Sequence, residues 1–392
     1  MAYLVNMTTL DHVNKPISIS PCINKRSDIS MNSTHSHANK ISRQAKLVKQ
    51  LIDTLTLMEI ERTADNTTAD VDAPVHLLPE HDAHHHRLFI GQSRDFVGPR
   101  IFGGQVLGQA LMAAALSLHQ PLHRLTTQTQ TAPSDDKLRP CHSLHGYFLR
   151  GGDDRWPVYY HVQALRDGRR LSARRVTAIQ IKHNKDNQPI EQIIFSMIAS
   201  FAPMEGGLEF QPPMPVYPPP EDLLSEQELK DQVIGKIPDA LQERFMRERH
   251  IHIKPVTPRD PIDPQPMPPK QANWLCVPQL GALDQLGIAP IYVQQALLAF
   301  SSDFYLVGTG LMAHGISFMT KGLQVASIDH SMHFHRPFDM NDWLLYDMWS
   351  DNTANAKGLN HGQFWQHGQL IATTQQEGLM RLRQSDSTPA HL

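Results

Sequence analysis

The chain has 392 residues, of which 40% are hydrophobic and 19% charged, and its net charge is −3. This length is enough for two domains of ordinary size. The balance of 36 Lys and Arg against 39 Asp and Glu argues against a nucleic-acid partner, whose phosphates require a dense basic surface. Three widely spaced cysteines without a CxxC pair exclude a disulfide scaffold and a thiolate zinc site.

The N-terminal residues give no sign of export. The opening MAYLVNMTTLDHVNKP lacks the apolar core and small-residue cleavage site of a secretory signal. No run is expected to approach the roughly 20 apolar residues that span a bilayer. We therefore expect a cytoplasmic protein without a membrane span.

Residues 1–45 are rich in Asn, Ser, Thr and His and have no apolar periodicity, which predicts a disordered tail. Ordered structure is expected from about Leu47, where LVKQLIDTLTLMEIE indicates a short helix followed by a strand. The polar segment 63–84 is interpreted as a loop insertion. Its histidine-rich run HDAHHHR, at residues 81–87, is more typical of a solvated loop than of a metal site.

A first domain is predicted at residues 46–205. The segment FGGQVLGQALMAAALSL, at 102–118, is apolar nearly all round, as a buried helix is. Strand-like runs follow at 143–150, 157–166, 171–182 and 190–201. One central helix followed by consecutive strands predicts an α+β domain in which a sheet wraps the helix.

Residues 206–270 are interpreted as a linker. Proline is dense in PPMPVYPPP and PVTPRDPIDPQPMPPK, and it stiffens a chain and is excluded from the interior of a sheet. Between these two stretches, residues 221–249 are charged and amphipathic, which predicts a helix.

The pattern then repeats at residues 271–385. A buried helix is expected at about 291–310, followed by strand-like runs near 323–335, 343–350, 358–366 and 369–382. The halves also share a spaced Arg, Trp and Tyr: Arg150, Trp156 and Tyr160 in the first, and Arg336, Trp343 and Tyr346 in the second. Together these features favour two copies of one fold.

Asp303 is the first residue that suggests chemistry. Helical spacing places it on one face with Ala296, Phe300 and Val307, where a carboxylate is costly without partners. Such a group is either a structural carboxylate bonded to the backbone or a catalytic one.

Two further polar residues are candidates to act together with Asp303. Gln376 shares the inward face of a strand with Leu370 and Thr374, and its amide both donates and accepts hydrogen bonds. Ser327, on another strand, offers a hydroxyl. Spacing alone does not show that Asp303, Ser327 and Gln376 meet.

Several long motifs resemble the acyl-CoA thioesterase II family, the double-hotdog thioesterases. They are DFYLVGTGLMAHGI, QVASIDHSMHFHRPF with DWLLY behind it, and IATTQQEGLMR in the second half, and RLFIGQSRDFVGPRIFGGQVLGQAL, HGYFLRGGD and LRDGRRLSARRVTAIQ in the first. The likeness covers residues 46–203 and 250–383. It implies two tandem hotdog domains, each a long central helix wrapped by an antiparallel sheet, and assembly into a homodimer or homotetramer.

The resemblance also implies a reaction, the hydrolysis of acyl-CoA to free fatty acid and CoA without metal or organic cofactor. In the family an Asp, a Ser or Thr, and a Gln orient and polarise the attacking water; by motif position these are Asp303, Ser327 and Gln376, with no covalent intermediate. The absence of a G-x-S-x-G elbow agrees with this. At His333 the family more often has an aromatic residue, which affects the expected shape of the acyl tunnel.

Two further roles each have a structural alternative. Backbone N–H groups near Gly104 and Gln105, at a helix start, are candidates for oxyanion or substrate binding, although close helix packing explains the same glycines equally well. A basic run offers charge-assisted bonds to CoA phosphates, or else forms an exposed strand face or a domain interface; its residues are Arg166, Arg169, Arg170 and Arg174.

Two rival functions stay open. A hotdog enoyl-thioester hydratase or dehydratase would need a His/Asp pair on the active helix, for which His314 is the nearby candidate. The histidines of IDHSMHFHRP are interpreted as packing residues, because strand alternation scatters them between faces. The other rival is a non-catalytic acyl-CoA-binding module.

Overall fold

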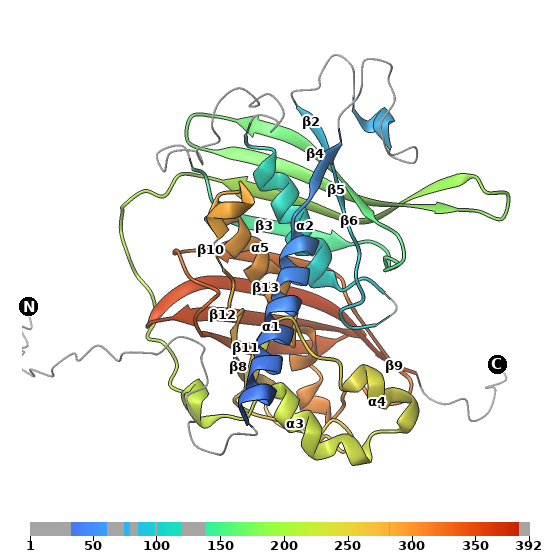
Figure 1. Ribbon diagram of the computed structural model, residues 1–392, viewed down its shortest axis with the longest axis vertical. Helices are drawn as coiled ribbons and strands as arrows, with labels where there is room; N and C mark the ends of the chain where they lie inside the picture. The colour runs from blue at the N-terminus through green and yellow to red at the C-terminus, as the bar shows by residue number, and fades with distance from the viewer. Residues whose placement is uncertain are drawn as a thin grey trace, which may run out of the picture.

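The computed structural model describes residues 33–60, 74–78, 85–98, 100–119, 138–281 and 283–383. Residues 1–32 of the expected tail and most of the expected insertion at 63–84 lie outside this description. The described chain forms two similar halves, with the first above the second in Figure 1.

The first half is a central helix with an antiparallel sheet around it, as predicted. Its elements are α1 (Ser33–Leu55), β1 (Met58–Ile60), the 3-10 turn η1 (Val75–Leu77), β2 (His86–Gly91), α2 (Gly103–Leu116), β3 (Cys141–Phe148), β4 (Val158–Asp167), β5 (Ser172–His183) and β6 (Pro189–Phe201). Helix α2 is buried at every position from Gly104 to Ala115, the environment that its apolar composition predicts.

The second half repeats this plan. Its elements are β7 (His252–Pro255), β8 (Lys270–Cys276), the turn η6 (Leu283–Leu286), α5 (Pro290–Ser302), the turns η7 (Val307–Thr309) and η8 (Met312–His314), β9 (Leu323–Ser327), β10 (Asp329–Phe334), β11 (Leu344–Ala354), β12 (Lys357–Gln366) and β13 (Gln369–Leu382). The strand expected at 323–335 is divided at Ile328. The N–H of Ile328 donates to the carbonyl of Glu377 (2.8 Å), and its own carbonyl accepts from Phe148 (2.9 Å).

The described strands form one continuous antiparallel sheet. Their order is β1-β2-β4-β5-β6-β3-β10-β13-β12-β11-β8-β7, and β9 also pairs with β13. The halves meet where β3 lies beside β10, with His145 opposite Ser331. The sheet therefore crosses from one half to the other without an edge, and a strand of each half protects its neighbour from open pairing.

The tyrosine that occurs at matching positions of the two halves makes the same kind of contact in both. Tyr160 on β4 donates its hydroxyl hydrogen to the Gln109 side chain on α2 (2.7 Å). Tyr346 on β11 donates to the backbone carbonyl of Ser302 on α5 (2.8 Å). Each tyrosine thus ties a strand to the central helix that it wraps, which supports the predicted duplication.

The two central helices pack closely at glycines. A Cβ at Gly104 would lie 2.3 Å from the Phe300 carbonyl oxygen, and one at Gly108 would lie 2.9 Å from that of Ala296. No side chain larger than hydrogen fits at these distances without a shift of the backbone. Side chains of α1, α2, α5 and both parts of the sheet join in one hydrophobic core, so the core spans the two halves.

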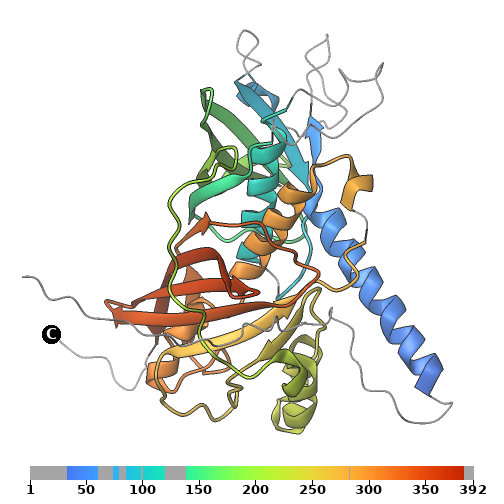
Figure 2. The ribbon, with the colours of Figure 1, turned by 90° about the vertical axis from the view of Figure 1, so that its left-hand side faces the viewer.

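Helix α1 begins earlier than predicted. It starts at Ser33, inside the expected tail of residues 1–45, and continues to Leu55. Val48, Leu51 and Leu55 are buried in the core, because their helical spacing puts them on one face of α1. Figure 2 shows α1 on the side of α2 and α5 that faces away from the sheet.

The linker differs from the prediction in two ways. The single helix expected at 221–249 is α3 (Glu226–Val233) and α4 (Asp239–Phe245), separated by the turn η5 (Ile234–Lys236). Gly235 and Pro238 fall in this break, and both disfavour a continuous helix. The end of the expected linker also enters the sheet, because β7 pairs with β8.

Residues 204–219 form an extended segment that runs along the outside of the molecule, on the left in Figure 1. Tyr217 donates to Asp347 (2.7 Å), and the Trp274 indole donates to the Pro218 carbonyl (2.9 Å). A small hydrophobic cluster with Trp343 and Trp365 lies beneath this segment. The segment is therefore fixed to the outer face of the second half.

One segment is more apolar than predicted. Pro290–His314, which contains α5, is long and apolar enough to cross a membrane, and 83% of its most apolar window is buried inside the protein. The sequence therefore does contain a segment of this length and apolar composition, contrary to the expectation. Burial in the core against α2 accounts for the composition.

Candidate active site

Asp303 lies at the end of helix α5 instead of on its middle turns. The helix ends at Ser302, and Asp303 is the capping residue, with φ −83° and ψ −11°. The prediction of a helix reaching residue 310 was therefore wrong, since 3-10 turns follow. The Asp303 side chain is nevertheless buried, at 8% exposure. This end position turns the carboxylate toward the sheet and toward the start of α2.

The three residues predicted to act together converge on this carboxylate. Gln376 on β13 donates its amide N–H to Asp303 Oδ1 (2.7 Å), and the Ser327 hydroxyl at the end of β9 donates to the same oxygen (3.4 Å). The backbone N–H of Gly104 donates to Oδ2 (2.9 Å). Both carboxylate oxygens are thus hydrogen-bonded, with donors from both halves of the chain.

The environment of Asp303 pulls its pKa in two directions. Burial raises the pKa of this carboxyl above the ordinary value, because it disfavours the charged form. The hydrogen bonds from Gln376, Gly104 and Ser327 lower it, and they offset only part of the effect. A carboxylate with a raised pKa is a stronger base than an exposed aspartate.

His330 is the residue that the sequence interpretation missed. Its Nδ1 lies 3.0 Å from Gln376 Nε2, and its Nε2 lies 2.9 Å from both the Ser302 and the Thr374 hydroxyl oxygens. Burial lowers the pKa of His330 to about 3, so the ring is neutral. A signal was present, because the alternation of β10 puts His330 on the inward face with Met332.

The helix start at Gly104 and Gln105 does not match the oxyanion role expected of it. The Gly104 N–H donates to Asp303, and the Gln105 N–H donates to the Phe102 carbonyl (3.0 Å). A Cβ at Gly103 would lie 2.6 Å from Asp303 Oδ2. The glycines therefore bring α2 against the carboxylate, and the N–H of Gly104 stabilises the charge of Asp303.

The basic run lies near the end of α2 that is remote from Asp303. Arg174 is buried, donates to Ser117 Oγ at the C-terminal end of α2 (2.9 Å) and pairs with Asp167 (2.8 Å). Arg166, Arg169 and Arg170 are exposed at the turn between β4 and β5. Asp303 lies at the other end of this helix, and a helix of 14 residues is about 20 Å long. Arg174 is thus bonded within the fold, and the role of the basic run at CoA phosphates stays a prediction.

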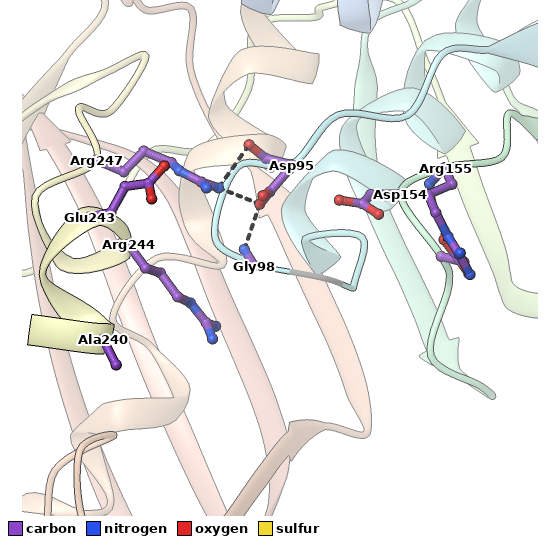
Figure 3. A pocket seen from close by; sticks show the side chains of 9 residues that line it. Asp95, Gly98, Asp154, Arg155, Ala240, Glu243, Arg244 and Arg247 are labelled. Carbon is purple, nitrogen blue, oxygen red and sulfur yellow. Dashed lines mark hydrogen bonds and ion pairs between the residues drawn. The ribbon is translucent and has the colours of Figure 1, made fainter.

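A surface cavity of about 540 Å³ does not include the three site residues. It is lined by Asp95, Gly98, Asp153, Asp154, Arg155, Ala240, Glu243, Arg244 and Arg247 (Figure 3). Arg247 pairs with Asp95, and Arg155 pairs with Asp153 (2.6 Å). The third arginine, Arg244, donates to the Val97 carbonyl (2.9 Å). The four carboxylates of the lining outnumber its three arginines, which leaves little net positive charge for a phosphate.

Other sites considered from the sequence are not assembled. Among the described residues there is no group of three His, Cys, Asp or Glu side chains placed to hold a metal ion. His314 is exposed and bonds to Thr353 Oγ1 (2.7 Å), near the end of β11. It does not provide the His/Asp pair that a hydratase would need.

Comparison with known proteins identifies the family. A model of the acyl-CoA thioesterase family matches residues 241–379, and a model of the acyl-CoA thioesterase N-terminal domain matches residues 92–202. Acyl-CoA thioesterase 2 of Haemophilus influenzae is 40% identical over 295 residues, which cover 75% of this chain and 92% of the relative. The chain belongs to the acyl-CoA thioesterase II family. The resemblance predicted from its motifs is therefore confirmed.

Other relatives agree with this thioesterase assignment. Human acyl-coenzyme A thioesterase 8 is 36% identical over 304 residues, covering 76% of this chain and 85% of the relative. The crystal structure of acyl-CoA thioesterase II TesB2 from Mycobacterium marinum is 28% identical, with a TM-score of 0.54 over 86% of this chain and all of that one. The predicted α+β class with two hotdog domains is confirmed, and the protein is a thioester hydrolase.

Proposed function

We propose that this thioesterase hydrolyses acyl-CoA to the free acid and CoA by direct attack of a water molecule that Asp303 activates. The convergence of Ser327, Gln376 and the Gly104 N–H on one buried carboxylate carries this proposal. The donors hold the carboxylate in a single orientation, which is what general-base catalysis needs. The predicted homo-oligomer and cytoplasmic location stay predictions.

The reaction balances with one proton carried by Asp303. The water oxygen attacks the thioester carbonyl carbon while Asp303 takes one of its protons, which gives a tetrahedral oxyanion. The oxyanion collapses, the carbon–sulfur bond breaks, and the proton on Asp303 passes to the departing thiolate. Free acid and CoA leave, and no acyl group is attached to the enzyme at any stage.

Two groups beside Asp303 are suited to hold the water. Ser327 donates its hydrogen to Asp303, so its oxygen keeps lone pairs to accept from water. The Gln376 Oε1 atom is buried and has no hydrogen-bond partner among the described residues. A water that donates to Asp303 and to one of these oxygens keeps a lone pair for the carbonyl carbon.

The hydratase alternative would use His330, which lies 4.0 Å from Asp303. Both ring nitrogens of His330 are already bonded inside the core, and its low pKa makes it a poor acid or base near neutral pH. The geometry therefore favours hydrolysis over addition of water to an enoyl group.

The test is thiol release from short, medium and long acyl-CoAs by the wild type and by Asp303→Asn. The variant should lose about 10²- to 10⁴-fold in kcat, the usual contribution of a positioned general base. Circular dichroism and the melting temperature check that the variant is folded. A folded variant with near-normal turnover would remove Asp303 from the mechanism.

A single turnover in H₂¹⁸O tests the absence of a covalent intermediate. Direct attack places one ¹⁸O atom in the free acid in that first turnover. Attack by the Asp303 carboxylate would instead form an anhydride, and hydrolysis of that anhydride at the Asp303 carbonyl carbon would leave an unlabelled oxygen of the protein in the acid and the ¹⁸O on Asp303. Unlabelled acid would therefore reject the direct route while keeping Asp303 as a reacting group.

A further inference from the structure

The Gln376 amide is held in one orientation, and the bond to Asp303 depends on it. Its Nε2 lies 2.7 Å from Asp303 Oδ1 and 3.0 Å from His330 Nδ1, so both amide hydrogens have acceptors if Nδ1 carries no proton. The opposite orientation would point Oε1 at the carboxylate oxygen, which is repulsive. The Asp303 carboxylate and an unprotonated His330 Nδ1 therefore favour the same orientation of the amide, whereas a hydrogen on Nδ1 would oppose it.

The hydroxyl groups behind His330 fix that protonation. Ser302 Oγ donates to the Ala299 carbonyl (2.9 Å), and Thr374 Oγ1 donates to the Ser331 carbonyl (2.8 Å). A hydroxyl has a single hydrogen, so when both hydrogens are given to these carbonyls the two oxygens act as acceptors toward His330 Nε2. In that arrangement Nε2 carries the ring hydrogen, and Nδ1 is left as an acceptor.

Burial keeps the second ring nitrogen unprotonated. His330 is fully buried, and this lowers its pKa to about 3, far below the pH range in which enzymes of neutral compartments work. The ring is thus neutral with one defined tautomer. The backbone carbonyls, the hydroxyls, the imidazole, the amide and the carboxylate form a chain in which each bond direction sets the next.

We infer that His330 is the positioning residue of this active site: its Nδ1 holds the Gln376 amide so that Nε2 donates to Asp303 and Oε1 stays free to accept from water. This inference rests on the proposed function, because it assumes that Asp303 is the base. It gives His330 no contact with substrate and no proton to transfer.

Removal of the acceptor at Nδ1 should free the amide to turn. Asp303 then loses the side-chain bond from Gln376 that lowers its pKa, and the pKa of this carboxyl rises further. The attacking water also loses an acceptor. Both effects reduce kcat, and the first also moves the acid limb of the pH–rate profile to higher pH.

The experiment compares His330→Asn with His330→Leu in the full-length protein. Asn and Leu have the same branched shape and leave similar space, but Asn keeps an acceptor oxygen at the place of Nδ1. We expect kcat of the Leu variant to fall on the order of 100-fold, as small misplacements of catalytic groups do, with KM little changed. The Asn variant should keep at least about tenfold more kcat than the Leu variant and an acid limb at lower pH.

The outcomes separate this inference from the proposed function. If Asp303→Asn abolishes thiol release while the Leu and Asn variants share one kcat and one acid limb, His330 has no positioning role and the base assignment survives. If Asp303→Asn releases thiol normally, the proposed function fails first. Loss of kcat in Leu with recovery in Asn supports the inference.

A measurement on the wild type covers the case in which both variants unfold. The ¹⁵N shifts of the His330 ring, in a sample labelled at histidine, report which nitrogen carries the hydrogen. We expect a protonated Nε2 and an unprotonated Nδ1 from pH 5 to pH 8. A hydrogen on Nδ1 anywhere in this range would overturn the inference.

Discussion

At the residue scale, burial of the Asp303 carboxylate is unfavourable and also makes the group a stronger base. An ionised aspartate inside a protein is unfavourable unless donors surround it. Asp303 has three such donors, yet burial still raises its pKa. The folded protein therefore holds a base that is stronger than it would be in water. The same burial means that Asp303 opposes folding at neutral pH, where it must be charged.

The raised pKa predicts the acid side of the pH–rate profile. Asp303 acts only when deprotonated, so kcat should fall as pH decreases through its pKa. Because burial moves this pKa above the ordinary 3.8, the fall should begin at higher pH than for an exposed aspartate. Thiol release measured from pH 4 to pH 8, with circular dichroism at each pH, checks this. A rate that stays constant to pH 4 in the folded enzyme would contradict it.

The hydroxyl group of Ser327 should contribute more to kcat than the size of its side chain does. Ser327→Thr keeps the donor to Asp303 and should keep kcat within about threefold, while Ser327→Ala should lose about tenfold, the equivalent of 1.4 kcal/mol. Ser331→Ala is the matched control, because Ser331 lies on the next strand, β10, and its hydroxyl bonds only to the Gln375 carbonyl among the described residues. Equal rates for the Ala and Thr variants would exclude a role for the hydroxyl.

At the element scale, the linker is part of the support of the site. Glu226 on α3 accepts hydrogen bonds from Arg249 (2.9 Å) and from the Tyr305 hydroxyl (2.6 Å), and pairs with Lys230 (3.3 Å). Tyr305, two residues after Asp303, has a left-handed backbone with φ 67°. Such a conformation costs free energy in a bulky residue, so surrounding contacts must hold it.

Replacing this buried carboxylate should destabilise the protein. Burial alone would raise the pKa of Glu226, but the charges of Arg249 and Lys230 and the hydrogen bonds from Arg249 and Tyr305 lower it to about 2. Its stabilisation is therefore complete above the unfolded pKa near 4.5 and is lost as pH falls toward 2. At pH 7 we expect Glu226→Gln to lower the free energy of unfolding by on the order of 3 kcal/mol, since two cations lose their partner.

Urea unfolding at pH 7 and at pH 3 measures this loss, which should be smaller at the lower pH. Asp231→Asn is the matched control, because Asp231 is an exposed carboxylate on the same helix, and it should change stability by less than about 0.5 kcal/mol. An equal effect of the two variants at pH 7 would show that the ion network adds no stability.

The elements differ in how far the sequence determined them. Helix α2 and strands β11 to β13 were predicted within a few residues, because their burial follows directly from apolar periodicity. The end of α5 at Asp303 was not, since no glycine or proline marks it. The Gly104 bond to Asp303 was also missed. It joins residues far apart in the chain, and local spacing contains no information on such a contact.

At the scale of the molecule, the duplication explains why each chain has one site. Strand register gives the first-half equivalents of Asp303, Ser327 and Gln376 as Ser117, Cys141 and Ala199. None of these supplies a carboxylate or an amide. The buried Arg174 side chain bonds to Ser117 there, where the second half has Asp303. The first half thus shares the fold without these side chains, and it contributes Gly104 to the proposed site in the second half.

The sheet and core that the two halves share predict that the halves stay associated when the chain between them is cut. The sheet is continuous through β3 and β10, the core includes side chains of both halves, and α2 packs on α5 at Gly104 and Gly108. Gly206 and Gly207 lie in the exposed connecting segment with no atoms close to where a Cβ would be, so a protease site inserted between them disturbs little.

After cleavage at that site, we expect the two fragments to elute together in size-exclusion chromatography and to release thiol at the rate of the uncut enzyme. The physical reason is that the catalytic carboxylate needs the Gly104 N–H from the other fragment, and the shared core holds the fragments at that distance. The uncut protein with the same insertion is the control. Separation of the fragments with loss of thiol release would show that the connection, and not the shared sheet and core, holds the site together.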